Sequence, residues 1–347
     1  MVLVVFLTSG RCELSHNYTP NLYMCKTIFK ILVNSLWTTE SGALLLYYKL
    51  MPTLPQINKT VLMSGADFFD DAAAINPFMN AHVPVDRTKA QAEHIVIRTA
   101  LQDAGVKVVQ VQPPASCQDG VYTANWALVR GDKAVMSTLP NARKGEEDYA
   151  EQVLRDLGKT TYKVPGGMHF SGQGDCLPCG NYLFAGSGYR TDPIAHAFVA
   201  ETLGYEVISL QTVPKRGFFG YGKPVINKAS GWADSFFYDI DLALSVLRPP
   251  TGRQKGLIAW CPEAFLPDSQ ATLRNFDGVD KIEVSLAEAK QAFACNLVST
   301  GSTVIMSNHA PHFQAELKQR GFKLVTPVIT ELAKGGGYIR CTTLTLD

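Results

Sequence analysis

Thr60-Val-Leu-Met-Ser64 is an apolar run rich in residues that favour strands, and Val106-Lys-Val-Val-Gln-Val111 is a second one. Between them, residues 88–104 place apolar side chains at the spacing of one helix face, namely Ala92, Ile95, Val96 and Ala100. Gly105 follows at once, and glycine is a common stop signal for a helix. The stretch therefore predicts a strand, a helix and a second strand, which is a basic unit of an α/β fold.

The same pattern recurs about every 45–55 residues along the rest of the chain, as in proteins built from repeated units. Further helices are expected over four ranges: 146–157, 193–203, 269–275 and 311–320. Strand-like runs flank each helix, and the last of them covers residues 341–346. Five such units could close into a ring with short strands around a central channel, so that neighbouring units share their cores. An open α/β sheet is the alternative, because periodicity alone does not separate the two.

The first 57 residues lack this pattern. Their apolar patches, for example Val2–Leu7, are all shorter than the roughly 18 residues needed to span a bilayer. We therefore expect residues 1–57 to be an N-terminal extension and residues 58–347 to form one domain of catalytic type. A cleaved targeting segment is the alternative for the first part.

The composition favours a small molecule as the partner of this chain. Hydrophobic residues make up 46% of it and charged residues 18%, which suits a protein with a large core. The formal net charge is +1, and the clustered Lys and Arg needed to bind nucleic acid or an anionic membrane are missing from the sequence. No GxGxxG or Walker sequence follows an expected strand, so the sequence gives no support to nucleotide binding.

Eight cysteines are spread along the chain without regular spacing. This density is far below that of a disulfide scaffold, and it fits a protein of the reducing cytoplasm. Cys176-Leu-Pro-Cys179 has the spacing of a CxxC pair. Because no second pair and no nearby pair of histidines completes a zinc site, we expect neither a metal nor a cofactor.

One cysteine and two aspartates stand where chemistry is expected. Cys341 comes shortly after Gly335-Gly-Gly337, where glycines permit positive φ and close backbone approach, so its thiol is expected at a rim and not in a packed interior. A structural thiol is the alternative. Asp175 and Asp241 each lie beside a turn or a strand start. Two carboxylates that face one pocket would bind a planar guanidinium by paired hydrogen bonds, although an Asx turn is the alternative for either residue.

Seven segments carry a family resemblance, in order, over residues 60–347. They are Asn76-Pro-Phe-Met-Asn80, Asp119 with Thr123-Ala-Asn125, Phe170 through Asp175, Gly188-Tyr-Arg-Thr-Asp192, Phe237 through Asp241, Phe293-Ala-Cys-Asn296, and Gly335 through Cys341. This set resembles the amidinotransferase and dimethylarginine dimethylaminohydrolase-type proteins of the pentein superfamily. The fold that the resemblance implies is a five-bladed pseudo-symmetric α/β propeller in a single domain. The implied chemistry is attack of a cysteine on a guanidinium carbon, loss of an amine, and a covalent thiouronium intermediate.

The resemblance also implies roles for particular residues. Cys341 matches the nucleophile, and Asp175 and Asp241 match the acids that hold the guanidinium, with Asp175 counted as catalytic. Asp119 and Asn125 fall in a segment that contacts substrate. Arg190 is placed to pair with the carboxylate of an amino acid.

Two positions depart from the family pattern. Asp239 stands where the Phe-Tyr-His-x-Asp motif has its histidine, and Ser171 stands where the glycine turn opens with Glu. That histidine normally protonates the leaving amine and then activates water. Asp239, the expected catalytic replacement, can protonate the amine only if burial and neighbouring carboxylates raise its pKa. Three histidines could substitute if the fold brings one of them close: His169, His309 and His312.

The sequence therefore predicts a cysteine-dependent hydrolase of a guanidino compound, arginine or a methylated arginine, that acts through a thiouronium intermediate. One alternative is a non-catalytic guanidino-binding member of the family, because of Asp239. Another is an amidinotransferase that uses the same intermediate. We further expect a small-molecule guanidino substrate, no nucleic acid, no membrane and a cytoplasmic location, with a homodimer as one option for assembly.

Overall fold

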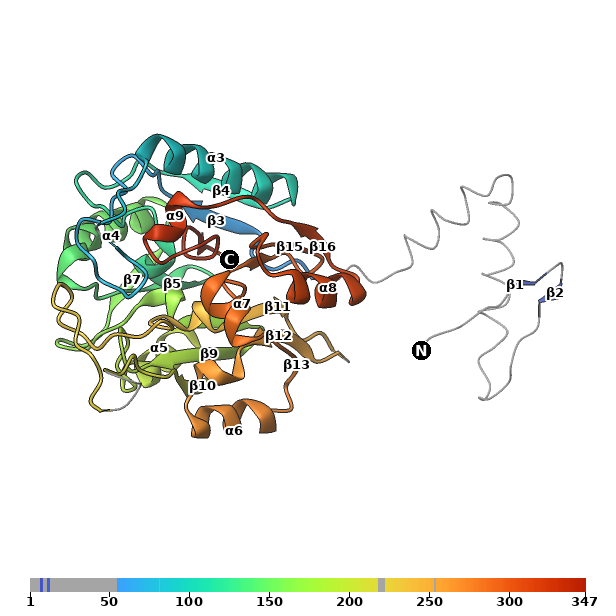
Figure 1. Ribbon diagram of the computed structural model, residues 1–347. Coiled ribbons are helices and arrows are strands. Elements are labelled where there is room, and N and C mark those ends of the chain that lie inside the picture. Colours follow the sequence, from blue (N-terminus) through green and yellow to red (C-terminus); the bar gives the residue numbers. More distant parts are fainter. Residues whose placement is uncertain (1–6, 9–10, 13–54, 81, 218–221, 253) are drawn as a thin grey trace. The chain divides into compact units, whose positions relative to one another are not determined.

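The computed structural model describes residues 7–8, 11–12, 55–80, 82–217, 222–252 and 254–347 (Figure 1). The chain divides into two compact units, Met1–Thr53 and Leu54–Asp347. In the first unit two short strands are described, β1 (Leu7–Thr8) and β2 (Arg11–Cys12), and they pair antiparallel. The expected extension over residues 1–57 thus lies almost entirely outside the described residues. Everything that follows concerns the second unit.

Five three-stranded sheets with one common plan make up the described part of the second unit. The first strand of each sheet pairs antiparallel with the second, and the second pairs parallel with the third. Four sheets use strands that are consecutive in the chain. Their strands are β5 (Ala127–Arg130), β6 (Lys133–Met136) and β7 (Thr160–Lys163); β8 (Cys176–Cys179), β9 (Tyr182–Ser187) and β10 (Glu206–Gln211); β11 (Leu244–Arg248), β12 (Gly256–Trp260) and β13 (Val279–Glu283); and β14 (Val298–Ser299), β15 (Thr303–Ile305) and β16 (Lys323–Val325).

The fifth sheet joins the two ends of the unit. It consists of β17 (Leu344–Thr345), β3 (Thr60–Met63) and β4 (Lys107–Gln110), in that order. Leu344 lies opposite Leu62 in the antiparallel pair of β17 and β3. The last strand of the chain, β17, thus belongs to the same sheet as β3, the first strand of the unit. The C-terminus accordingly lies beside β3 in Figure 1. The expected five-bladed α/β propeller is confirmed.

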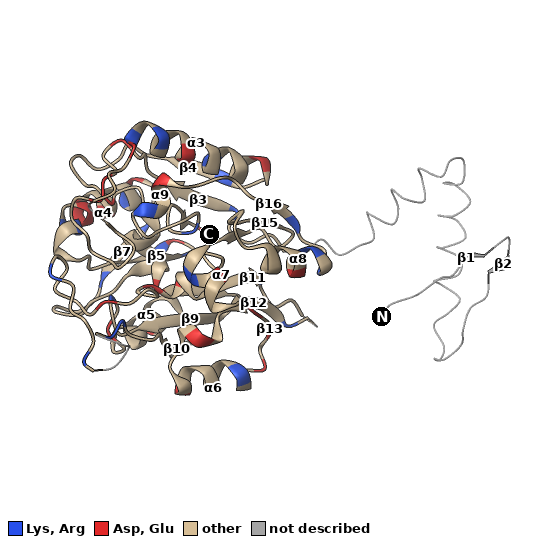
Figure 2. Cartoon of the chain, viewed as in Figure 1, with Lys and Arg blue, Asp and Glu red and all other residues tan. Residues whose placement is uncertain are grey.

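A helix connects the second strand to the third in every sheet, because parallel neighbours need a crossover. These helices are α3 (Arg87–Asp103), α4 (Glu147–Asp156), α5 (Ala195–Leu203), α6 (Pro267–Asn275) and α8 (Pro311–Gln319). They lie on the outside of the unit, around the strands (Figure 1). Charges of both signs are mixed on α3, α6 and α8, as is usual for solvated helix faces (Figure 2). None of the described helices is long and apolar enough to cross a bilayer.

Short helices and turns complete the unit. They are the helices α7 (Leu286–Gln291) and α9 (Glu331–Lys334) and the 3₁₀ turns Thr123–Trp126, Asn141–Glu146, Gly172–Gly174, Ile240–Leu242 and Pro262–Ala264. Three of these turns, which begin at Thr123, Gly172 and Ile240, lie just before the first strand of a sheet. Residues of the candidate site come from these positions.

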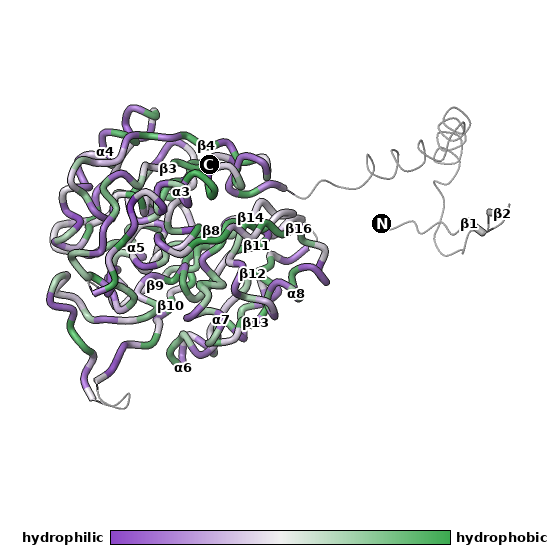
Figure 3. The backbone as a smooth tube through the Cα atoms, turned by 45° about the horizontal axis from the view of Figure 1, so that its top comes forward, coloured by the Kyte–Doolittle hydropathy of each residue, from purple (hydrophilic) through white to green (hydrophobic). Residues whose placement is uncertain are grey.

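The core lies along the inner strands of the sheets. The first strands β8 and β14 are almost completely buried. The third strands β4 and β7 are half-buried in the middle and exposed at both ends. Hydrophobic segments accordingly gather around β8 and β14 within the unit (Figure 3). Each large side chain buried in this way contributes about 1.5–3 kcal/mol to folding. The first strands are therefore held firmly, and so are the loops that lead into them.

One expectation about a strand was wrong, and one strand was missed. The last strand covers only Leu344–Thr345, so Cys341 lies in a turn before it, and its side chain is 2% exposed and not at a rim. Cys176–Cys179 is a strand in a hairpin with β9, not merely a CxxC spacing. Pro178 hid this strand, because proline is tolerated only at a sheet edge, and β8 is the edge strand of its sheet.

Leu344→Ala tests the closing strand. The Leu344 side chain is fully buried, so its removal leaves a cavity where the ring closes, and we expect the free energy of unfolding to fall by about 2–5 kcal/mol. Urea denaturation followed by circular dichroism measures this loss. Val328→Ala, at a residue that is 62% exposed, is the control and should change stability by less than about 0.5 kcal/mol. Equal small effects in both variants would contradict closure through β17.

Candidate active site

The propeller places five polar residues at equivalent positions. Each lies one to three residues before the first strand of its sheet, where the five chain segments converge because the first strands are the inner ones. They are Asn125 before β5, Asp175 before β8, Asp241 before β11, Asn296 before β14 and Cys341 before β17. All five side chains are at most 3% exposed. Residues far apart in the sequence are thus brought to one place by the repeat itself.

Cys341 is held by two of these neighbours. Its Sγ lies 3.1 Å from Nδ2 of Asn296 and 3.3 Å from Oδ2 of Asp241. The Oδ1 atom of Asn296 also accepts hydrogen bonds from the backbone N–H groups of Cys341 and Tyr338, each at 3.1 Å. Asn296 therefore fixes the turn that carries the thiol and contacts the sulfur as well. Sequence reasoning assigned Asn296 no role, although it stands in the segment Phe293–Asn296 that carried part of the resemblance.

The glycines before Cys341 are needed for close packing. Gly336 has φ of 86°, which disfavours any side chain. A Cβ atom on Gly337 would lie 2.6 Å from the ring of Tyr122 and 2.9 Å from Cβ of Cys341. The Tyr122 hydroxyl in turn donates to the carbonyl of Leu332 at 2.5 Å. The triple glycine thus lets the thiol turn pack directly against a buried tyrosine.

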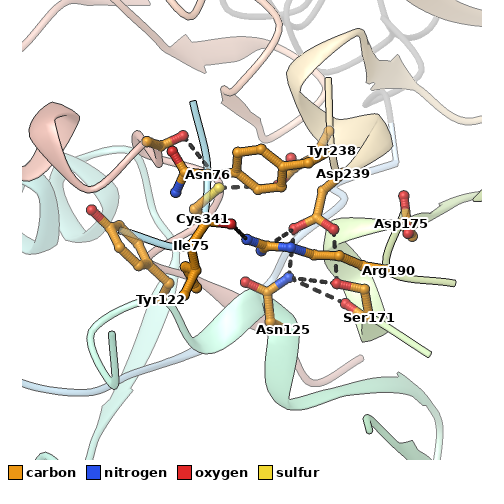
Figure 4. Close-up of polar contacts among 12 residues, drawn as sticks. Ile75, Asn76, Tyr122, Asn125, Ser171, Asp175, Arg190, Tyr238, Asp239 and Cys341 are labelled. Carbon is orange, nitrogen blue, oxygen red and sulfur yellow. Dashed lines mark hydrogen bonds and ion pairs between the residues drawn. The ribbon is translucent and has the colours of Figure 1, made fainter. Parts of the chain in front are cut away.

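Asp239 is surrounded by hydrogen-bond donors (Figure 4). Asn125 donates from Nδ2 to Oδ2 at 2.7 Å, and the Ser171 hydroxyl donates to Oδ1 at 2.8 Å. Nη1 of Arg190 lies 3.5 Å from Oδ2. A Cβ atom on Gly174 would lie 2.7 Å from the same oxygen, so only glycine allows the turn to approach this closely. All three partners point hydrogens at the carboxylate, the arrangement that an acceptor-only group requires.

Arg190 is buried in this cluster. Its guanidinium stacks on the ring of Tyr238, 4.0 Å from the centroid, and Nη2 donates to the carbonyl of Ile75 at 3.4 Å. The side chain is about 6% exposed in its ion pair with Asp239. The 3.5 Å and 3.4 Å contacts are both long, so Arg190 is held mainly by stacking. A stronger anion placed nearby can therefore compete with Asp239 for it.

Asp175 and Asp241 each have one buried oxygen without a partner among the described residues: Oδ2 of Asp175 and Oδ1 of Asp241. The second oxygen of Asp175 accepts from the backbone N–H of Ile240 at 2.9 Å. Burial, followed by the nearby charge of Asp239, raises the pKa of Asp175 to about 8 and that of Asp241 well above its ordinary value. Each buried polar atom left unpaired costs about 1–3 kcal/mol. Both shifts favour the protonated acids, and each unpaired oxygen could accept a hydrogen bond from a donor.

Asp119 is linked to Asn125 through Arg143. Its Oδ2 accepts from the side chain of Gln118 at 3.0 Å, and burial raises its pKa to about 6, although the charge of Arg143 opposes the rise. Arg143 donates to Oδ1 of Asn125 at 2.8 Å and to the Asp119 carbonyl at 3.2 Å. It also forms a fully buried ion pair with Glu146 at 2.7 Å. Arg143 and Glu146, which sequence reasoning missed, hold Asn125 and Asp119 in place.

The surroundings of Cys341 disfavour its thiolate. Burial raises the pKa of Cys341 well above its ordinary value, and any negative charge on Asp241 or Asp239 raises it further. A bound cation would act in the opposite direction on the thiol and on all the nearby acids. The geometry therefore suits a site whose nucleophile ionises only after a positively charged ligand has entered.

The three histidines proposed as substitutes lie elsewhere. His169 stacks on Trp232, with ring centroids 4.4 Å apart, and is 3.5 Å from Asp192. His309 and His312 are exposed at the start of α8. In the described part of the chain, none of the hydrogen bonds of Cys341 or Asp239 involves a histidine. Nor does any group of three or more His, Cys, Asp or Glu side chains there have an arrangement that could hold a metal ion.

Comparisons with known proteins agree with this geometry. A family described as N,N dimethylarginine dimethylhydrolase, eukaryotic, matches residues 67–227. The N(G),N(G)-dimethylarginine dimethylaminohydrolase of Mycobacterium tuberculosis is 34% identical over 284 residues, which cover 81% of this chain and 84% of that protein. The chain belongs to the dimethylarginine dimethylaminohydrolase family.

Two related enzymes act on arginine itself. The bifunctional arginine dihydrolase/ornithine cyclodeaminase AgrE of Nostoc is 30% identical over 288 residues, and the match covers 82% of this chain but only 37% of that protein. The substrate-bound N-terminal domain of the cyanobacterial arginine dihydrolase ArgZ superposes with a TM-score of 0.70 at 28% identity, over 82% of this chain and 97% of that domain. A dimethylarginine dimethylaminohydrolase structure with a TM-score of 0.59 and 16% identity shares the fold.

Asp175 makes the stability of the empty protein depend on pH. Its pKa rises from an ordinary value of 3.8 to about 8 on folding, so the folded state holds the proton more tightly. The resulting stabilisation is complete below about pH 4 and is lost as the pH rises through 8. We expect the melting temperature to fall between pH 5 and 8, and to fall less steeply in Asp175→Asn. Asp268→Asn on the surface of α6 is the control, and parallel slopes for all three proteins would contradict a protonated Asp175.

Proposed function

We propose that this protein is a hydrolase that acts on the guanidino group of arginine or a methylated arginine, with Cys341 as the nucleophile. The observation that carries the proposal is the buried Oδ1 of Asp241, which has no partner among the described residues and belongs to the carboxyl group that contacts the Cys341 thiol. Asp175, whose charge acts on Asp241, has a second such oxygen. A guanidinium offers planar N–H pairs that carboxylates accept better than they accept an ammonium group. The family membership of the chain independently supports this class of substrate.

Binding of the guanidinium would prepare the nucleophile. The positive charge lowers the pKa of the Cys341 thiol and of both acids, so that Asp175 and Asp241 become carboxylates that hold the ligand. The sulfur then attacks the guanidinium carbon, and a C–S bond replaces one C–N bond. The Asp241 carboxylate, 3.3 Å from the sulfur, takes the thiol proton as the sulfur attacks and passes it to the departing amine. The thiouronium intermediate remains on Cys341.

Water would complete the reaction. It adds to the thiouronium carbon, its proton goes to an acceptor, and the ureido product leaves as the thiol is restored. Asp239 is the candidate acceptor, because Asn125 and Ser171 keep its oxygens oriented as hydrogen-bond acceptors. An ArgZ structure at 27% identity, described as covalently bound to a reaction intermediate, supports a covalent route in that relative.

A non-catalytic guanidino-binding protein is the second candidate. Asp239 favours it, because no described histidine hydrogen-bonds with Cys341, and an imidazole is the usual group for protonating an amine near neutral pH. This protein would still bind the guanidinium at Asp175 and Asp241. Amidino transfer to an amine acceptor shares the same intermediate and stays a prediction from the sequence.

A citrulline assay with arginine and methylated arginines separates these functions. We expect product from the wild type and none from Cys341→Ser, which keeps the size but loses the nucleophile. Product that survives Cys341→Ser would contradict the assignment of Cys341. Two variants that restore the residues of the family pattern separate an active enzyme from a binding protein: Asp239→His alone, and Asp239→His together with Ser171→Glu. The double variant is needed because Ser171 and Asp239 are hydrogen-bonded to each other at 2.8 Å. Activity only in a repaired variant would establish a lapsed enzyme.

Arg190 is proposed to bind the carboxylate of the substrate amino acid, as a stronger partner than Asp239. Arg190→Ala should then reduce kcat/KM for arginine about 10–100-fold, since a hydrogen bond to a charged group contributes about 1.5–3 kcal/mol. Agmatine, which has the guanidino group but no carboxylate, is the matched control and should lose far less. An equal loss for both substrates would mean that Arg190 acts only through Asp239.

Location and assembly belong to the same proposal. The described cysteines Cys117, Cys176, Cys179, Cys261, Cys295 and Cys341 are all free thiols. Free thiols in this number fit a reducing compartment, and we place the protein in the cytoplasm on that basis. A homodimer stays a prediction.

A further inference from the structure

A cavity of about 290 Å³ has a lining that includes Arg340, the residue directly before Cys341, but not Cys341 itself. Its wall includes two arginines, Arg130 and Arg340, and the hydroxyl-bearing Ser245 of β11. Apolar side chains such as Leu177, Leu244 and Leu297 form much of the remainder. Within the described chain, the lining does not include Cys341, Asp175, Asp239 or Asp241, so the cavity is separate from the candidate active site. Its size is at the lower end for ligand sites and suits a small molecule.

Arg340 is a buried cation, and the charges of Asp241 and Asp347 act on it from beyond ion-pair distance. The side chain is 5% exposed, and Nη1 donates to Thr345 Oγ1 at 2.9 Å and to Asn58 Oδ1 at 3.4 Å. Nη2 donates to Oε1 of Gln173 at 2.9 Å. These partners are neutral, and among the described residues Arg340 forms no ion pair. A buried charge is costly unless it is paired, so this guanidinium has a free energy to gain from an anion.

Arg130 adds a second positive charge to the wall. Its Nη1 donates to the carbonyls of Leu203 at 3.0 Å and Gly204 at 2.6 Å, and its guanidinium stacks on Tyr205 at 4.1 Å. It too forms no ion pair with a described residue. The carboxylate of Asp347 also lines the cavity, but its two oxygens accept from the backbone N–H groups of residues 59 and 60 at 3.1 Å and 2.7 Å. The balance of charge around the cavity remains positive.

Ser245 supplies an independent sign of a ligand. Its side chain is 4% exposed, and its Oγ is buried with no hydrogen-bond partner among the described residues. A buried hydroxyl is normally paired, and the cavity that it lines is the open space beside it. An unpartnered donor and a guanidinium without an ion pair thus line the same cavity, and a small anion could satisfy both.

We propose that this cavity binds a small oxoanion, held by the guanidinium of Arg340 and the hydroxyl of Ser245, with Arg130 adding positive charge. Arginine suits such a ligand because its planar N–H groups match the spacing of two oxoanion oxygens. The apolar part of the lining lowers the local dielectric and so strengthens charge-assisted hydrogen bonds.

Isothermal titration of the full chain with inorganic phosphate, and separately with sulfate, tests the site without any turnover. We expect saturable binding of one anion per chain. Ser245→Ala should weaken it about tenfold or more, since a hydrogen bond to a charged group is removed, and Arg340→Gln should abolish it. Arg274→Gln, which removes the same charge from an exposed ion pair on α6, is the control and should bind as the wild type does.

Several results would overturn the proposal. They are a lack of saturable binding up to about 50 mM of either anion, unchanged affinity in Ser245→Ala, or equal loss in Arg274→Gln. Binding that is lost in Arg190→Ala but kept in Arg340→Gln would place the anion in the candidate active site instead. If circular dichroism shows that Arg340→Gln does not fold, the comparison of Ser245→Ala with Arg274→Gln decides alone.

Discussion

The pairing of β17 with β3 joins the last strand of the chain to the first strand of the folded unit, and the site is built on this contact. Leu344 lies opposite Leu62, and three residues earlier the chain turns at Cys341. If the strand were not held there, the thiol would have no fixed relation to Asp241 or Asn296, which come from other sheets. Closure of the ring through β17 and β3 thus determines both the fold and the position of the Cys341 thiol.

Buried negative charge is the second constraint. Asp239 lies close enough to Asp175 and Asp241 that its charge raises the pKa of both. The protein offsets this locally: Asn125, Ser171 and Arg190 satisfy Asp239, whereas Asp175 and Asp241 keep their protons and an unpaired oxygen each. The arrangement costs stability in the empty protein, and a bound cation would relieve it. Shifted pKa values of this kind are typical of functional sites.

The sequence was informative where local pattern decides the structure. Residues 88–104 and 311–320 have the spacing of helices and form α3 and α8 within a residue or so of the expected ends. The chain order of the seven segments also brought Cys341, Asp175 and Asp241 into one hypothesis. By contrast, the burial of Cys341 depends on Tyr122 and on closure of the ring, and these are contacts between distant parts of the chain. Asn296, Arg143 and Glu146 act through such contacts too, and an isolated asparagine or an i,i+3 ion pair carries no signal that separates it from a surface residue.

The central claim is that Asp175 and Asp241 are neutral acids until a guanidinium ligand converts them to carboxylates. Calorimetric titration of Cys341→Ser with arginine at pH 7, in two buffers of different ionisation enthalpy, counts the protons released on binding without turnover. We expect net proton release when arginine binds to Cys341→Ser, because the pKa of Asp175 in the folded protein is about 8 before the ligand enters. Adding Asp175→Asn to Cys341→Ser should reduce this release. Binding with no net proton release in either variant would show that the acids are already ionised, and would contradict the account.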